Sequence, residues 1–135
     1  MRTLIEAVRR IVAAEPDVRL SVLFGSAARN ELRPGSDVDV AVLGVASVQL
    51  GALEAAISRA TGRSVDLVSL DTAPPLLRFE VARDGLVLTE RVPHAWSDFK
   101  ARAMVDWWDW APYARRFHRA AAGRLRDEAA GHGQT

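Results

Sequence analysis

Two aspartates separated by one valine begin a segment in which acidic and apolar residues alternate. Asp37 and Asp39 alternate with Val38, Val40 and Val42, which predicts a strand with its acids on one face and its valines on the other. Two carboxylates on one side of a strand repel each other unless a cation lies between them. Magnesium suits such a pair, because it takes one or two protein carboxylates and completes its coordination with water and phosphate oxygens. The competing interpretation is a solvated pair on an edge strand, and the expected burial of the valine face argues against it.

A third acid lies on another predicted strand, over residues 64–70. Asp66 has apolar neighbours there, and a central strand seldom carries a lone charge. If this strand lies beside the earlier one, Asp66 completes a cluster of three carboxylates that could hold two metal ions about 3.5–4 Å apart. Asp71 ranks below Asp66 as the third acid, because it falls in a loop where a cap or turn role is ordinary.

A glycine and a serine follow the short apolar segment 18–24, which predicts a buried strand that ends in a tight turn. At such a turn, free backbone N–H groups and the missing side chain of Gly25 let a phosphate group approach closely. Ser26 could add a hydroxyl donor to the same oxygens. Taken alone, this pair is usually only a turn.

Two further polar residues lie in the loop between the turn and the acidic strand. Arg29 could reach a phosphate group, or it could brace the loop against Glu31, and the residue types favour neither. Ser36 directly precedes Asp37, and we expect it to orient the loop by local hydrogen bonding.

Hydrophobic periodicity predicts the elements that must position these residues. The predicted order is helix, strand, strand, helix, strand, helix, strand, and Gly62 is the expected C-terminal cap of the second helix. The expected helices cover about residues 4–14, 50–60 and 74–83, and the expected strands cover residues 18–24, 38–42, 64–70 and 86–89. This order predicts an α/β (α+β) fold with a small mixed sheet and helices packed on it.

A helical segment is expected over residues 97–128, with Ser97 as its capping residue. Trp107, Trp108 and Trp110 cannot all face one side of a helix. They could pack on the sheet, or they could anchor a protein interface together with nearby arginines. The arginines are Arg115, Arg116 and Arg119.

Composition limits the kind of protein. The 135 residues, 49% of them hydrophobic, suit one compact domain, and the absence of cysteine suits a reducing compartment, so the cytoplasm is expected. No apolar stretch approaches the length of a membrane span. A net charge of +1 lacks the basic excess of a dedicated duplex-binding protein, so nucleic acid is not expected as a direct substrate.

The stretch from Leu23 to Asp39 resembles the signature of the DNA polymerase beta-like nucleotidyltransferase superfamily, in which Gly-Ser is followed after ten residues by Asp-x-Asp. The chain length and Asp66 resemble its minimal nucleotidyltransferase (MNT) branch, and the resemblance covers about residues 18–90. One departure is Asn30, where the family often has glycine. Because asparagine tolerates left-handed backbone, we expect the loop to survive.

The resemblance implies roles for the candidate residues. Gly25 and Ser26, with Arg29 and Ser36 nearby, would hold the triphosphate of ATP. The aspartates would bind magnesium, two ions being expected, and the third of them would be a ligand or the base. These aspartates are Asp37, Asp39 and Asp66. A nucleotidyltransferase core over residues 1–96 and a helical extension over residues 97–130 are expected.

The acceptor is the open question. A bare domain of this size suits a protein acceptor, and the MNT members that resemble antitoxins neutralise a helical HEPN ribonuclease toxin by transferring AMP to a tyrosine. The resemblance therefore implies a HEPN toxin partner in a hetero-oligomer. Two alternatives are transfer to a small-molecule hydroxyl, such as that of an aminoglycoside, and an antitoxin that binds its partner without catalysis.

Overall fold

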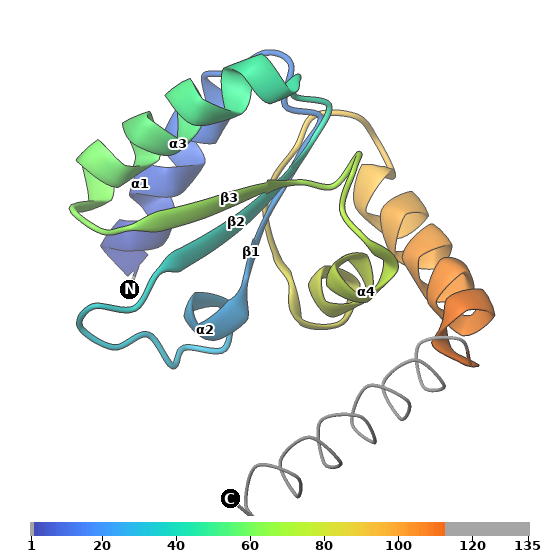
Figure 1. The fold of residues 1–135 in the computed structure, drawn as a ribbon. Helices are drawn as coiled ribbons and strands as arrows, with labels where there is room; N and C mark the ends of the chain where they lie inside the picture. The colour runs from blue at the N-terminus through green and yellow to red at the C-terminus, as the bar shows by residue number, and fades with distance from the viewer. Residues whose placement is uncertain (1, 113–135) are drawn as a thin grey trace, which may run out of the picture.

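The structure, a computed structural model, describes residues 2–112 of the chain as one sheet with a helical layer on each face (Figure 1). The elements follow the predicted order, with a one-turn helix added after the first strand. They are α1 (Arg2–Ala13), β1 (Leu20–Phe24), α2 (Gly25–Ala28), β2 (Val38–Leu43), α3 (Ser47–Thr61), β3 (Val65–Ser69), α4 (Pro75–Asp84) and β4 (Leu86–Glu90). A further helix covers residues 95–112.

The sheet is mixed, as expected, and its strand order is β3-β2-β1-β4. Strand β1 pairs antiparallel with β2 and β4, whereas β2 and β3 run parallel. Helices α1 and α3 cover one face, and α4 with the helix at 95–112 covers the other (Figure 1). The valines of β2 belong to the α1 and α3 side. Because side chains alternate along a strand, Asp39 lies on the side of α4.

Two local expectations are met by backbone geometry. Gly62 ends α3 in the left-handed conformation, with φ 67°, and its N–H donates to the carbonyl of Ser58. Asn30 also has a positive φ, 57°, so asparagine supports the left-handed position that glycine often holds in the family. The predicted start of the first strand at residue 18 was two residues early, because β1 begins at Leu20.

The expected cap of the last helix was wrong. This helix begins at residue 95, so Ser97 lies inside its first turn and donates its hydroxyl hydrogen to the carbonyl of His94, at 3.2 Å. The N–H of Trp96 instead donates to the carboxylate of Glu90 at the end of β4, at 2.8 Å. A side chain from the preceding strand therefore does the work expected of a local serine. The division of the chain near residue 96 stays a prediction.

Among residues 2–112, no helix is both long enough and apolar enough to cross a membrane.

Candidate active site

The parallel pairing of β2 and β3 brings two of the predicted acids together. Asp39 on β2 and Asp66 on β3 are partners in register, so their side chains leave the same face of the sheet. Asp37 lies just outside β2, which begins at Val38. The strand adjacency on which the role of Asp66 depended is therefore present, although Asp37 belongs to a loop and not to the strand.

Electrostatics single out Asp39 among the three. Its side chain is half-buried, while Asp37 and Asp66 are exposed. Burial raises the pKa of Asp39, the negative charges of Asp66 and Asp37 raise it further, and the positive charge of Arg29 lowers it. The three carboxylates thus lie near enough to oppose ionisation of the central one.

The three acids do not form a closed metal site as they stand. Within residues 2–112, no three acidic or histidine side chains converge closely enough to bind one metal ion. A pair on adjacent strands with a third acid in the flanking loop is the observed arrangement.

Gly25 lies directly against the carboxylate of Asp39. It joins β1 to α2 with a φ of 69°, a backbone conformation that favours glycine. A methyl group added at Gly25 would collide with Oδ2 of Asp39. Both the backbone angle and the lack of space therefore require glycine here, and the main chain passes the acid at close range.

Hydrogen bonds from polar groups inside and outside the loop hold the segment between α2 and β2. Nε of Arg29 donates to the carboxylate of Glu31 at 3.1 Å, so the bracing contact is present. The hydroxyl of Ser36 accepts the N–H of Arg33 at 3.2 Å, as expected of a residue that orients the loop. Arg63 adds a bond from Nη1 to the carbonyl of Arg33 at 3.1 Å. The backbone carbonyl of Ser26 accepts a bond from the N–H of Glu31, at 2.8 Å.

A pocket of about 280 Å³ opens beside Asp39 and is called here the Asp39 pocket. Gly25 and Arg29 line it, which places Arg29 both at the loop brace and at the pocket. Charged residues of the last turns of α4 form its other wall. The full lining is Phe24, Gly25, Arg29, Asp39, Glu80, Arg83 and Asp84.

Sequence reasoning missed the wall that α4 contributes. Arg83 donates two hydrogen bonds to Asp84, at 3.0 and 2.8 Å, and its guanidinium lies 5.5 Å from the ring centre of Phe79. The hydrogen bond from Arg83 holds the pKa of Asp84 below its usual range. The available signal was the spacing of Glu80, Arg83 and Asp84, which share one face of a helix.

Asp71, the lower-ranked third acid, lies away from this site. It accepts the N–H of Gly44 at 2.8 Å and forms an ion pair with Arg19 at 3.6 Å. Gly44 follows the end of β2 that lies opposite Asp39. Asp71 therefore has the turn role that its loop position indicated.

The three tryptophans divide between packing and solvent. Trp107 stacks on Phe79 of α4 with ring centres 5.0 Å apart, so its partner is a helix and not the sheet. Trp108 is 75% exposed and Trp110 is 38% exposed. The arginines proposed to join them, Arg115, Arg116 and Arg119, lie outside the described residues.

The fold, the Gly-Ser and Asp-x-Asp signature and the pair of Asp39 with Asp66 together indicate a nucleotidyltransferase. A comparison with protein-family models agrees. Residues 6–94 match the family model described as polymerase beta, nucleotidyltransferase. The chain belongs to this nucleotidyltransferase family. No curated protein matches the chain.

Solved structures share the fold. A chain of a toxin–antitoxin complex with AMP-PNP is 21% identical with a TM-score of 0.78, covering 87% of this chain and 97% of that one. A chain of the complex between tri-AMPylated Shewanella oneidensis HEPN toxin and MNT antitoxin is 19% identical with a TM-score of 0.74, covering 89% and 97%. A protein proposed to be a minimal nucleotidyltransferase is 34% identical with a TM-score of 0.54, covering 63% and 89%.

Proposed function

We propose that the chain transfers AMP from ATP to a hydroxyl group of a partner protein, and that the partner is a HEPN toxin. The observation that carries the proposal is the in-register pair Asp39 and Asp66, beside a glycine that leaves no room for a side chain. Family membership supports the reaction class. The fold shared with chains from toxin–antitoxin complexes supports a toxin as the partner. The cytoplasm stays the expected compartment.

The charges of these acids suit a hard divalent cation, although the three side chains do not converge on one point. The pKa of Asp39 is raised by burial and by two neighbouring carboxylates, so a cation would relieve the repulsion that these groups now experience. We propose that Asp37 and Asp39 hold magnesium, with Asp66 as the third ligand or the base. Bound magnesium would neutralise charge on the triphosphate and lower the pKa of a bound oxygen.

The residues of the chain would position and polarise the reactants. The acceptor oxygen forms a bond to the α-phosphorus of ATP, the bond from that phosphorus to the bridging oxygen breaks, and pyrophosphate leaves with the electron pair. Asp66 would take the proton of the acceptor hydroxyl. Gly25 and Ser26 would let the triphosphate approach the main chain, and Arg29, which lines the Asp39 pocket, would offer it a positive charge.

A transfer assay with the partner tests this proposal. The chain, labelled ATP, magnesium and a co-expressed HEPN protein should place the label on that protein. Asp39→Asn should abolish transfer, and Asp106→Asn, an exposed aspartate on the helix at 95–112, should leave it unchanged. If no label appears on any HEPN protein tested, although labelled ATP and magnesium are present, the proposal of a protein acceptor is contradicted.

Two other outcomes separate the alternatives. Label on an added aminoglycoside, and none on protein, would assign a small-molecule acceptor. If the double variant Asp37→Ala and Asp39→Ala loses transfer yet still protects cells from the toxin, binding alone neutralises the partner.

A further inference from the structure

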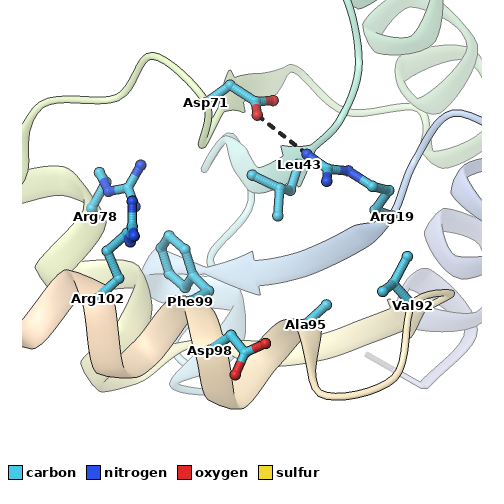
Figure 2. A pocket seen from close by; sticks show the side chains of 9 residues that line it. All are labelled: Arg19, Leu43, Asp71, Arg78, Val92, Ala95, Asp98, Phe99 and Arg102. Carbon is cyan, nitrogen blue, oxygen red and sulfur yellow. Dashed lines mark ion pairs between the residues drawn. The ribbon is translucent and has the colours of Figure 1, made fainter.

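A second pocket lies at the other end of the same sheet face. It has a volume of about 350 Å³, which suits a small ligand (Figure 2). Leu43 lines it, and Leu43 pairs with Leu20 at the opposite end of the β1 and β2 ladder from Asp39. We call it the arginine pocket, and its lining is Arg19, Leu43, Asp71, Arg78, Val92, Ala95, Asp98, Phe99 and Arg102.

Arg78 has a donor that the described residues leave unused. Its Nη1 donates to the carbonyl of Leu70 at 2.6 Å, and its guanidinium carbon lies 5.1 Å from the ring centre of Phe99. Its Nε is buried without a hydrogen-bond partner among residues 2–112. Buried hydrogen-bond donors are nearly always paired, because an unpaired donor loses its hydrogen bonds to water without gaining one to the protein. The guanidinium of Arg78, which lines the pocket, therefore keeps one donor without an acceptor among residues 2–112.

A second guanidinium lies at the same end of the pocket. Arg102 follows Phe99 by three residues on the helix at 95–112, and it forms no ion pair with any other described residue. Figure 2 shows the guanidinium groups of Arg78 and Arg102 on one side of the Phe99 ring. Arg19 is different, since it is paired with Asp71. Two cations without described counterions favour an oxyanion between them.

The rest of the lining limits the kind of anion. Four apolar side chains line the pocket, namely Leu43, Val92, Ala95 and Phe99. Three arginines and two aspartates line it, so one carboxylate balances its formal charge, whereas a phosphate dianion or a triphosphate would exceed that charge. A single carboxylate on a short apolar body meets both conditions.

We propose that the arginine pocket binds a monocarboxylate with a short apolar chain, held by Arg78 and Arg102. This chemistry has two sources, a free small acid and the C-terminal residue of a polypeptide. The site is separate from the Asp39 pocket, and the proposal does not depend on nucleotidyl transfer.

Isothermal titration of the full chain tests the proposal with three probes. They are 4-methylpentanoate for a free acid, N-acetyl-leucine for a C-terminal residue, and inorganic phosphate. At least one carboxylate should bind in the millimolar range or more tightly, and phosphate should not compete. Preference for N-acetyl-leucine would indicate a chain terminus, and preference for 4-methylpentanoate would indicate a free acid.

Substitutions locate the binding. Arg102→Gln removes an exposed charge without disturbing the core, and it should weaken carboxylate binding about tenfold. Arg78→Lys keeps the charge but loses the planar fork, and it should also weaken binding. The matched control is Arg59→Gln on α3, across the sheet, which should bind like the parent. No carboxylate binding, tighter binding of phosphate, or equal loss in Arg59→Gln and Arg102→Gln would each overturn the proposal.

Discussion

The two ends of one sheet face carry opposite uncompensated charge. At one end, Asp39 faces two other carboxylates and its pKa is raised. At the other end, Arg78 has a buried unpaired Nε, and Arg102 has no ion-pair partner among the described residues. Helix α4 borders both pockets. Opposite charges that could have neutralised each other are kept apart, and a ligand at each end, as proposed above, would balance them.

The largest effect is expected from Asp39→Asn at the acidic end. Transfer of AMP should fall at least about a hundredfold, because the proposed magnesium loses a charged ligand. The folded chain should nevertheless become more stable at pH 7, by about a few degrees in Tm, because the amide cannot be repelled by Asp66 and Asp37. Transfer assays and thermal unfolding measure the two effects.

The gain in Tm expected for Asp39→Asn should depend on pH, in a direction set by the raised pKa of Asp39. Since the pKa of Asp39 is raised in the folded chain, folding is favoured while the group is protonated, and that advantage disappears as pH rises through the folded pKa. The Tm difference between Asp39→Asn and the parent should therefore be largest near neutral pH and shrink towards about pH 4. A difference that grows on acidification would contradict the repulsion described here.

Gly25→Ala should be the next largest change. Alanine would meet Oδ2 of Asp39 and would hold an unfavourable positive φ, so we expect a loss of about 1–3 kcal/mol in the free energy of unfolding. Gly51→Ala is the matched control, because Gly51 lies within α3 and has open space around it. That variant should gain up to about 1 kcal/mol. Urea unfolding of both chains measures the joint cost of the positive φ and of the contact with Asp39 at position 25.

Asp66→Asn tests whether the two acids paired across β2 and β3 interact. Removing its negative charge makes ionisation of Asp39 easier, so the pKa of Asp39 should fall towards its ordinary value. Carbon NMR of the side-chain carboxyl group across a pH titration measures this pKa. If the pKa of Asp39 is unchanged in Asp66→Asn, the two acids do not interact and Asp66 loses its proposed role.

The smallest effect is expected at the basic end. Arg19 and Asp71 form an ion pair at 3.6 Å whose side chains are 53% and 38% exposed. Arg19→Gln should therefore change the free energy of unfolding by less than about 1 kcal/mol. A loss of several kcal/mol in urea unfolding would show that charge at this end stabilises the fold more than the exposure of the pair indicates.

The sequence could predict those parts of the site in which a reactive residue and the strand or turn that carries it lie in the same short segment. The alternation at Asp39, the apolar flanks of Asp66 and the turn at Gly25 are local signals, and the predicted strands and helices match the structure to within a few residues. The pairing of β2 with β3 is not local, so the placement of Asp66 opposite Asp39 remained conditional until the sheet order was known.

Features that depend on packing between distant elements escaped prediction. The wall that Arg83 adds to the Asp39 pocket depends on how α4 lies against β1. The spacing of the charged residues marks one face of α4, but it does not say which part of the sheet that face meets. The prediction that Ser97 caps the last helix was wrong for the same reason. Ser97 has the residue type of an N-cap, but it lies inside the first turn of the helix. Glu90, at the end of β4, accepts the N–H of Trp96 instead.

The bond from Trp96 to Glu90 ties the start of the last helix to the edge of the sheet. Because β4 is itself paired with β1, the same bond couples the helix to the sheet. We expect the last helix to gain its protection against amide exchange together with the edge strand, as one cooperative unit. Loosening β4 should then release the helix as well, along with the arginine that it contributes to the second pocket.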